Sequence, residues 1–294
     1  MKIAIYGKSI DEEDITIVCS MLDKIERVGA EVTLHQRFYN ALRSKNVELK
    51  SNVQVFQTHQ EIKNEVQFLF SLGGDGTFLD TILLVKDSNI PILGINTGRL
   101  GFLSTTATSE IETAIDAISK GEFQIEKRSL IELEDEDKIF GDECFALNEI
   151  SVLKKDTSSM INIEVELDGI HLNTYWTDGL IISTATGSTA YSLSCGGPIL
   201  MPGSGNFVLT PIAPHNLNVR PIVINDHSIL KLKVEGRADR NLVALDSRSK
   251  ELKNGATILV KKAKHQISIV HFTNDSFIQS LRNKLNWGLD KRNI

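Results

Sequence analysis

Hydrophobic residues recur along this chain with two different rhythms. Up to about residue 105, short apolar runs typical of buried strands alternate with segments in which apolar residues follow helical spacing. The expected strands are Ile3–Tyr6, Glu31–His35, Val66–Leu72 and Pro91–Ile95, and the expected helices are Asp14–Val28, Phe78–Val85 and, just beyond this part, about Ser109–Lys120. This alternation predicts an α/β domain in which helices cover a parallel sheet.

From Phe123 to about Phe272 the pattern changes to short strands joined by turn residues. Its clearest element is Ile161–Leu167, where apolar and polar residues alternate strictly before an Asp168-Gly169 turn, a strong hairpin signal. Further strands are expected at Ile229–Val234, Leu242–Leu245, Ile258–Lys261 and Ile267–Val270. This part predicts an all-β, sandwich-like domain that is larger than the first.

The change of rhythm predicts two domains. Residues 1–105, together with about 273–294, form the expected α/β domain, and residues 106–272 form the β-rich domain. The closing segment Ser276–Trp287 is amphipathic, so we expect it to pack back on the first domain. A length of 294 residues agrees with two domains of ordinary size.

Composition and charge narrow the class of protein. With 41% hydrophobic and 24% charged residues the chain is ordinary for a globular protein, and a net charge of −6 argues against bulk nucleic-acid binding. No run approaches the apolar length of a membrane span, and Met1–Gly7 has the pattern of a first strand rather than a signal peptide. Cys19, Cys144 and Cys195 form no C-x-x-C pair, which fits a reducing compartment. We therefore expect a soluble, cytoplasmic protein that binds neither membrane nor nucleic acid.

The most informative segment is the loop 73–77, which reads Gly-Gly-Asp-Gly-Thr between a strand and a helix. Residues without a Cβ let the backbone approach a bulky anion, and a helix N-terminus at a strand end favours phosphate. Asp75 adds a negative charge, which such a site needs only to handle a proton, a metal or a hydroxyl. The loop therefore predicts phosphoryl transfer to a hydroxyl, with Thr77 as the cap of a helix that begins at Phe78.

A simpler interpretation of this loop is a tight turn in which Asp75 accepts local N–H groups. Two common nucleotide-binding loops are excluded by their residues. The Walker A pattern fails because no lysine follows the glycines, and the Rossmann pattern G-x-G-x-x-G fails because its last position is Leu79. The histidines show no H-x-x-H or H-x-x-x-H spacing, so no metal site made of protein ligands is predicted.

A second informative stretch runs from Asp178 to Ser194, where the strand Leu180–Ser183 leads into a turn rich in hydroxyls and a short helix. Hydroxyl and N–H groups at a helix start can hold phosphate or ribose oxygens, although one or two of them could simply cap the helix. The hydroxyl residues are Thr184, Thr186, Ser188, Thr189, Ser192 and Ser194, more than one cap needs. Asn148-Glu149 and Asp246-Ser247 each add a carboxylate that alone would indicate only a turn.

Several short segments are informative through their residues and their order. They are Gly73-Gly74-Asp75-Gly76-Thr77, Gly94-Ile95-Asn96-Thr97-Gly98, Gly101-Phe102-Leu103, Asn148-Glu149, Asp178–Ser194, Gly196-Gly197-Pro198, Pro211-Ile212-Ala213-Pro214-His215, Arg220-Pro221 and Leu285-Asn286-Trp287. Together they resemble the NAD kinase family and keep its order from about Leu72 to Ser247. The glycine loop alone is shared with lipid kinases and phosphofructokinases, whereas the block from Asp178 to Pro198 makes the resemblance specific.

The resemblance implies the reaction and its reagents. Members of this family transfer the γ-phosphoryl group of ATP, or in some members polyphosphate, to the 2′-hydroxyl of the adenosine ribose of NAD, which makes NADP. Asp75 is then the proton acceptor facing that hydroxyl, and because phosphoryl transfer is loose, positioning the hydroxyl matters more than deprotonating it early. Mg²⁺ or another divalent metal offsets charge that no loop lysine neutralises. The loop residues that hold the nucleotide are Gly73, Gly74, Gly76 and Thr77.

The resemblance also implies the contacts to NAD. Asn148 and Glu149 look like the pair that meets the ribose hydroxyls, and Tyr191 is expected to stack on a base. The remaining implied NAD-binding residues are Asp178, Thr189, Ala190, Ser192, Ser194 and Ala213. NAD then touches both domains, and a homo-oligomer, dimer or tetramer, is expected because the family assembles through its β domain. The chain departs from the commoner family pattern at four positions. Many relatives carry a basic residue at the place of Trp176, and the place of Ser159 can also be basic. Cys195 stands where Ala is common, and Arg248 stands where relatives often have an uncharged residue.

Two other interpretations use the same residues. A lipid or sugar kinase could share the glycine loop, but a lipid kinase is expected to show an apolar or basic membrane-facing stretch, and none is evident. A non-catalytic dinucleotide sensor could keep the pocket, but loss of Asp75 would favour that interpretation, and Asp75 is present. The sequence therefore favours the kinase, with NAD or NADH as acceptor, ATP or polyphosphate as donor, and control by NADP or NADPH left open.

Overall fold

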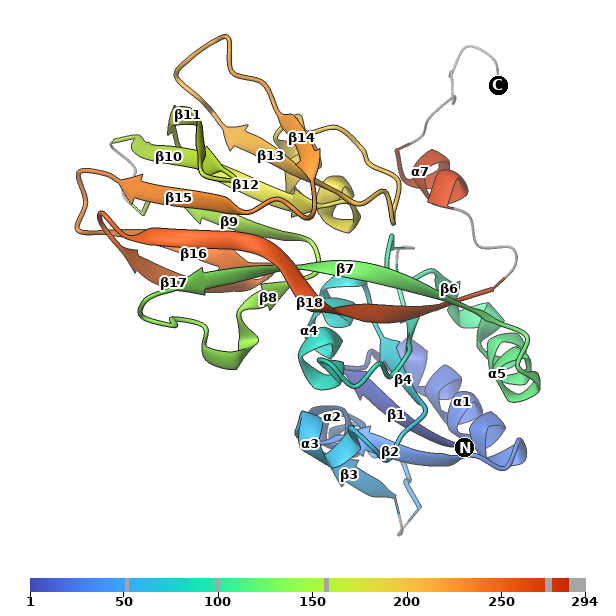
Figure 1. Ribbon diagram of the computed structural model, residues 1–294. Helices are drawn as coiled ribbons and strands as arrows, with labels where there is room; N and C mark the ends of the chain where they lie inside the picture. The colour runs from blue at the N-terminus through green and yellow to red at the C-terminus, as the bar shows by residue number, and fades with distance from the viewer. Residues whose placement is uncertain (51–52, 99–100, 156–158, 273–276, 286–294) are drawn as a thin grey trace. The chain divides into compact units, whose positions relative to one another are not determined.

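The computed structural model describes residues 1–50, 53–98, 101–155, 159–272 and 277–285, and its contacts divide the chain into two units. Unit 1 consists of Met1–Lys127 with Ile267–Ile294, and unit 2 of Arg128–Gln266. The borders fall inside two long strands, β7 (Gln124–Asp135) and β18 (Thr257–His271), each of which continues from one unit into the other (Figure 1). The sequence pattern changes earlier, near residue 105, because a helix and the start of β7 still belong to unit 1.

Unit 1 is built on a parallel sheet, as expected. Its strands lie in the order β5-β4-β1-β2-β3, and the carboxyl-terminal part of β18 pairs in parallel with β5. Their bounds are β1 Lys2–Gly7, β2 Glu31–His35, β3 Gln54–Phe56, β4 Phe68–Leu72 and β5 Ile92–Asn96, with a short β6, Thr106–Ala107, beside β5. All five residues of β4 and of β5 are buried, which is why both read as continuous apolar runs.

Helices α1, α2, α4 and α5 of unit 1 pack against strands of this sheet. In α1 (Ile15–Arg27) the buried residues Val18, Met21 and Ile25 follow helical spacing. The other helices are α2 Gln36–Ser44, α3 His59–Ile62, α4 Asp75–Val85, α5 Ile111–Lys120 and α7 Phe277–Leu285, with 3₁₀ turns at Glu12–Asp14 and Thr108–Glu110. Helices α2 and α3 were not predicted, because α2 buries only Phe38 and Leu42 and α3 is a single turn. Helix α7 belongs to unit 1, as its amphipathic pattern predicted.

Unit 2 is a β sandwich, as predicted, but it is not the larger unit, because residues 106–127 and 267–272 belong to unit 1. One sheet is antiparallel, in the order β14-β13-β12-β9-β16-β17, and the second contains β11-β10-β15-β18 with β7 and β8 (Figure 1). The bounds are β8 Phe145–Ala146, β9 Glu149–Leu153, β10 Ile161–Leu167, β11 Ile170–Thr177, β12 Gly179–Thr184, β13 Asn206–Ile212, β14 Ile222–Asn225, β15 Leu230–Glu235, β16 Arg240–Leu245 and β17 Arg248–Lys253. Short helical turns lie at Gly141–Glu143 and Thr186–Thr189, and α6 spans Tyr191–Ser194.

The hairpin β10–β11 shows the two features that its sequence predicted, an alternation of buried and outward-facing residues and a two-residue turn. Ile161, Ile163 and Val165 are buried in the core that both sheets share, while residues between them face outward. At the turn, Asp168 and Gly169 both have positive φ, +50° and +82°, the backbone that a two-residue hairpin turn needs. This hairpin is therefore confirmed with its predicted turn.

One prediction about the strands near the end of the β-rich part was wrong. Ile258–Lys261 and Ile267–Val270 were expected as separate strands, but both are parts of the continuous strand β18. Polar residues between them interrupt the alternation without interrupting the backbone pairing, and Lys262 among them is held by an ion pair with the buried Asp226 at 2.7 Å. In the part of the chain that the structure describes, no helix combines the length and the apolar character needed to cross a membrane.

Candidate active site

The glycine loop lies where β4 ends and α4 begins. Gly73 has a φ of +137°, and a Cβ placed there would lie 2.5 Å from Oγ1 of Thr77, so this position requires glycine. For Gly74 and Gly76, no heavy atom of the described residues lies within 4 Å of such a Cβ. These two backbone positions therefore face open space into which an anion can come.

Thr77 does not have the predicted role as a cap. Helix α4 begins at Asp75 with Gly74 as its N-cap, so Thr77 is buried in the first turn. The helix starts earlier than its apolar pattern indicates because Asp75 places a negative charge on the first turn, where the helix dipole favours it.

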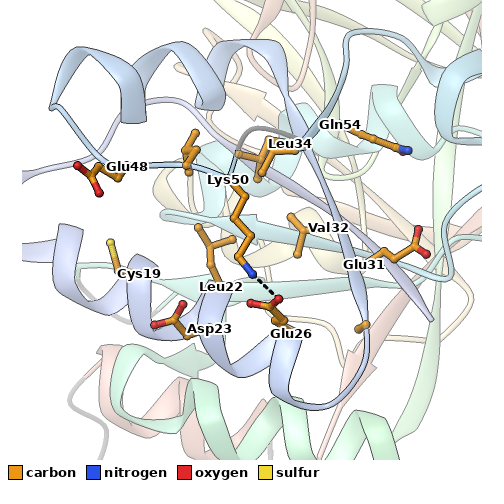
Figure 2. A pocket seen from close by; sticks show the side chains of 13 residues that line it. Cys19, Leu22, Asp23, Glu26, Glu31, Val32, Leu34, Glu48, Lys50 and Gln54 are labelled. Carbon is orange, nitrogen blue, oxygen red and sulfur yellow. Dashed lines mark hydrogen bonds and ion pairs between the residues drawn. The ribbon is translucent and has the colours of Figure 1, made fainter.

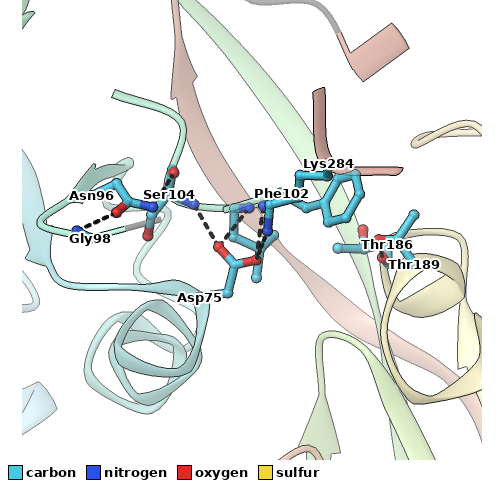
Figure 3. Close-up of polar contacts among 9 residues, drawn as sticks. Asp75, Asn96, Gly98, Phe102, Ser104, Thr186, Thr189 and Lys284 are labelled. Atoms are coloured by element: carbon cyan, nitrogen blue, oxygen red, sulfur yellow. Dashed lines mark hydrogen bonds and ion pairs between the residues drawn. The ribbon is translucent and has the colours of Figure 1, made fainter. Parts of the chain in front are cut away.

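The Asp75 carboxylate is held by three backbone N–H groups of one loop (Figure 3). Its Oδ2 accepts from Phe102 at 2.8 Å, and its Oδ1 accepts from Leu103 and Ser104 at 3.0 Å each. Hydrogen bonds to a charged acceptor are about twice as strong as neutral ones. The segment 102–104 is therefore tied to Asp75, whose side chain is 31% exposed.

Glycines that the sequence analysis assigned only by resemblance make this contact possible. A Cβ on Gly101 would lie 1.8 Å from Oδ1 of Asp75, and a Cβ on Gly94 would lie 2.7 Å from the carbonyl oxygen of Leu103. Asn96 supports the same loop, since its Oδ1 accepts from the N–H of Gly98 at 2.7 Å (Figure 3). The motifs around residues 94–103 thus serve the placement of Asp75.

A residue of the C-terminal helix reaches the same carboxylate. Nζ of Lys284 lies 3.9 Å from Oδ2 of Asp75 and 4.7 Å from the centre of the Phe102 ring. Phe277 at the start of α7 also packs near Phe102, with ring centres 6.1 Å apart. Lys284 was not predicted as a site residue. The segment that resembles the family begins one residue later, at Leu285, which ends α7, and its other residues, Asn286 and Trp287, lie outside the described residues.

In unit 2, the backbone of Asn148 and Glu149 is held by Asp246. The Asp246 carboxylate accepts N–H groups of Leu147 at 2.9 Å, Asn148 at 2.8 Å and Glu149 at 3.2 Å. Gly187 packs against the same segment, because a Cβ there would lie 2.1 Å from the carbonyl oxygen of Asn148. The ambiguous Asp246 is therefore the support of the Asn148-Glu149 pair.

Glu149 is a buried carboxyl group with an unusual protonation state. Burial, with a smaller contribution from the charge of Asp246, raises the pKa of Glu149 to about 8. Its Oε2 has no hydrogen-bond partner among the described residues. The three N–H groups favour the charged form of Asp246, while burial raises its pKa. With a pKa of about 8, Glu149 is largely protonated at neutral pH.

Most hydroxyls of the turn after β12 point into the protein. Oγ1 of Thr184 donates to the carbonyl of Leu147 at 2.6 Å, Oγ of Ser188 donates to that of Ala185 at 2.7 Å, and Oγ of Ser192 bonds Oγ1 of Thr210 at 2.8 Å. The side chain of Tyr191, in contrast, is 41% exposed, and Ser194 is also exposed. Thr189 and Ala190, which precede Tyr191, are half-buried.

The predicted NAD-binding residues of unit 2 fall into two groups at opposite ends of β12. Residues 148–149 and 186–194 lie by its carboxyl end, since the N–H of Thr184 donates to the carbonyl of Asn148 at 2.8 Å. Asp178 and Ala213 lie at its amino end, where the N–H of Asp178 donates to Ile212 at 3.0 Å. The six residues of β12 span about 20 Å at 3.3 Å per residue. Asp178 also forms an ion pair with Lys154 at 2.7 Å, and Ala213 has a φ of +46°.

Three of the departures from the family pattern, at Trp176, Ser159 and Arg248, have identifiable surroundings. Trp176 and Ser159 line one hollow of about 460 Å³ that also contains Arg237. The Arg248 guanidinium donates to the backbone carbonyls of Glu143 and Phe145, so it fixes the segment before β9.

A separate cavity of about 580 Å³ lies against α1 and β2 of unit 1 (Figure 2). Its described lining includes Cys19, Glu26 and Lys50, and none of the predicted site residues. Within the described ranges, no three His, Cys, Asp or Glu side chains are grouped so that they could hold a metal ion.

A glycine loop and a helix N-terminus at the carboxyl edge of a parallel sheet, next to a carboxylate held in place, define a nucleotide-binding phosphotransferase. Family models confirm this class and make it specific. Residues 3–123 match the ATP-NAD kinase N-terminal domain, and residues 147–272 match the ATP-NAD kinase C-terminal domain. The chain belongs to the NAD kinase family, and it is an enzyme that phosphorylates NAD with ATP.

Individual relatives agree over the full length. The chain is 46% identical to an NAD kinase of Flavobacterium psychrophilum and 41% identical to one of Cytophaga hutchinsonii, in each case across the whole of both chains. Among solved structures it is similar to an NAD kinase from Archaeoglobus fulgidus in complex with ATP, with 27% identity, a TM-score of 0.76, and coverage of 97% of this chain and 99% of that one. The yeast NADH kinase complexed with NADH has a TM-score of 0.86 at 22% identity, over 99% of this chain and 89% of that one, and shows the shared fold.

The substitution Gly101→Ala tests the loop that holds Asp75. The added Cβ lies 1.8 Å from Oδ1 of Asp75, so the loop or the carboxylate must move, and we expect kcat to fall at least tenfold. Gly98→Ala is the matched control, because its Cβ meets Oδ1 of Asn96 only at 3.9 Å, and kcat should stay within twofold. Equal turnover of both variants would show that the placement of Asp75 does not matter.

The substitution Glu149→Gln tests the raised pKa. A carboxyl group with a folded pKa near 8 and an ordinary unfolded pKa binds its proton more tightly in the native state, so its contribution to stability is lost as pH rises toward 8. Glutamine does not titrate. The melting temperature of the variant minus that of the wild type should therefore increase as the pH rises from 5.5 to 7.5. The difference in the free energy of unfolding between the two proteins should change by at most about 1.4 kcal/mol per pH unit. Parallel melting temperatures across this range would mean that Glu149 titrates normally.

Proposed function

We propose that this enzyme transfers the γ-phosphoryl group of ATP to the 2′-hydroxyl of the adenosine ribose of NAD, with Asp75 as the residue that accepts the hydroxyl proton. The observation that carries this proposal is the position of one carboxylate at the first turn of α4, directly beside a glycine loop whose backbone is open to an anion. The relatives named NAD kinase supply the identity of the acceptor.

The hydrogen bonds of Asp75 leave room for this role. An ionised carboxylate has about four acceptor positions. Leu103 and Ser104 occupy two on Oδ1, and Phe102 occupies one on Oδ2. The remaining position is on Oδ2, from which Nζ of Lys284 lies 3.9 Å away, beyond hydrogen-bond distance. A ribose hydroxyl can donate to this position without displacing the loop that fixes the carboxylate.

The donor nucleotide is assigned to the glycine loop. Gly74 and Gly76 leave space for phosphate oxygens, and the N-terminus of α4 favours their charge. The structure of the Archaeoglobus relative with ATP supports a nucleotide in this fold. We propose that the divalent metal arrives with the nucleotide, because Mg²⁺ is commonly bound through one or two carboxylates together with substrate phosphates.

Asn148 and Glu149 are assigned to NAD, together with the turn that carries Thr189, Ala190 and Tyr191. A protonated Glu149 can donate a hydrogen bond to a ribose oxygen, and its unpartnered Oε2 is the group to be satisfied. The exposed Tyr191 ring is available for stacking on a base. The remaining residues of the proposed NAD site are Ser192, whose hydroxyl is already bonded to Thr210 so that its backbone makes the contact, Ser194, Asp178 and Ala213.

We further propose that the enzyme is cytoplasmic and assembles as a homo-oligomer, a dimer or a tetramer, through unit 2. Large apolar side chains are exposed on this unit, among them Ile170, Trp176 and Val223. An oligomer would bury such side chains.

The substitution Asp75→Asn tests the proton acceptor. Purified enzyme with ATP, Mg²⁺ and NAD, coupled to an NADP-specific dehydrogenase, should form NADP, and the variant should lose at least a hundredfold in kcat while its Kd for NAD changes less than threefold. Because an amide offers one acceptor oxygen, part of the loss could come from the loop 102–104. Gly101→Ala disturbs that loop and keeps the carboxylate, so a larger loss in Asp75→Asn isolates the carboxylate. Wild-type turnover in Asp75→Asn would exclude the role.

The substitution Gly74→Val tests the donor site. A branched side chain fills the space in front of the loop, so the Kd for ATP should rise at least tenfold while the melting temperature stays within a few degrees. Calorimetric titration with ATP and Mg²⁺ measures this directly. Unchanged ATP affinity would place the donor elsewhere.

A further inference from the structure

Lys8 reaches the glycine loop from a different part of the chain. It follows β1, whose last residue Gly7 pairs in register with Leu72 at the end of β4. Parallel register therefore carries Lys8 to the same edge of the sheet as the loop that follows Leu72. Nζ of Lys8 lies 3.0 Å from the carbonyl oxygen of Gly76 in the first turn of α4.

A carboxylate on α4 holds the amine in this position. Oδ2 of Asp80 lies 2.9 Å from Nζ of Lys8 and also accepts the hydroxyl of the buried Tyr6 at 2.7 Å. Burial and the contact with Asp80 raise the pKa of Tyr6, so its hydroxyl stays a donor. Asp80 is thus fixed from one side, and the Lys8 side chain remains about a third exposed.

The donor site needs a positive charge, which the amine of Lys8 can supply. A nucleoside triphosphate brings several negative charges to the loop, and the loop has no lysine of its own, unlike a Walker A loop. An ammonium group is a compact cation on a flexible stem, well suited to follow a phosphate over a few ångströms. Lys8 is already at the flank of the loop, hydrogen-bonded to it through Gly76.

We propose that Lys8 binds the phosphates of the donor nucleotide and supplies the positive charge that the glycine loop lacks. It exchanges Asp80 for a phosphate oxygen when ATP arrives, so Asp80 competes with the ligand for the amine. This inference rests on the proposed placement of ATP at the glycine loop. The alternative is that the pair Lys8–Asp80 only anchors α4 to β1.

The two possible roles predict different changes in the Kd for ATP when Lys8 and Asp80 are substituted. Phosphate binding predicts changes in opposite directions, and anchoring predicts changes in the same direction. If Lys8 binds phosphate, Lys8→Met should raise the Kd for ATP about ten- to a hundredfold, since a charge-assisted hydrogen bond is lost. Asp80→Asn should lower that Kd two- to fivefold, because it removes the competitor and keeps an acceptor for Tyr6. If the pair only anchors α4, both variants should weaken ATP binding alike and lower the melting temperature together.

The experiment titrates the full-length enzyme with ATP and Mg²⁺ by calorimetry and measures KM for ATP and for NAD by the coupled assay. Lys8→Met should raise KM for ATP and leave KM for NAD within twofold, and Lys8→Arg should keep ATP affinity within about fivefold. In the double variant, the gain from Asp80→Asn should vanish, because no amine is left to release. Persistence of that gain without Lys8 would contradict the exchange.

The outcomes separate this inference from the proposed function. If wild-type enzyme forms NADP and Gly74→Val weakens ATP binding, while Lys8→Met leaves the Kd for ATP unchanged, the donor site stands and the role of Lys8 is refuted. If Gly74→Val leaves ATP affinity unchanged, the proposed donor site itself fails, whatever Lys8→Met does. Loss of ATP affinity in both Gly74→Val and Lys8→Met, with Asp80→Asn moving in the opposite direction, establishes the phosphate contact.

Discussion

Three consecutive backbone N–H groups donate hydrogen bonds to the Asp75 carboxylate, and the geometry of the candidate active site in unit 1 depends on this contact. It joins the start of α4 to a loop nearly thirty residues later in the chain, and it fixes the direction of the carboxylate at the first turn of the helix. Glycines at positions 94 and 101 are needed because larger residues would collide with the loop or with the carboxylate itself. A cluster of motifs that resembles a family signature is thus explained by one packing requirement.

Unit 2 uses the same device with a different result. Asp246 also accepts three consecutive N–H groups, those of residues 147–149, and it also fixes a short segment that carries polar side chains. The two carboxylates differ in their surroundings: burial raises the pKa of the partly buried Asp246, whereas the side chain of Asp75 is 31% exposed. Asp246 supports its neighbours in the chain, while Asp75 keeps one acceptor position on Oδ2 for a substrate. Burial, and after it the interaction with Asp246, raises the pKa of the neighbouring Glu149.

Charge is distributed around the donor loop by the fold rather than by the loop sequence. Lys8 directly follows the first strand, and Lys284 lies in the last described helix. Tertiary packing brings Lys8 to Gly76 of the loop and Lys284 to Asp75. Glycine-rich loops can therefore dispense with a lysine of their own when the sheet register delivers one from a neighbouring strand. Because Lys8 and Lys284 are already paired with Asp80 and Asp75, an arriving anion competes with these carboxylates for the ammonium groups.

The sequence by itself determined the elements whose physics is local. Apolar runs set the strands β4 and β5, helical spacing set α1 and α5, the Asp168-Gly169 turn set its hairpin, and the glycines at 73–76 marked the strand-to-helix loop around Asp75. Tertiary structure alone decided what depends on partners distant in the chain: the N–H groups that Asp75 accepts, the inward hydroxyl of Ser192, the support of Asn148 by Asp246 and the arrival of Lys8 at Gly76. The reason is physical. A pattern of apolar and polar residues records which face of an element is buried, but hydrogen bonds and charges are assigned only when the folded chain brings donor and acceptor together.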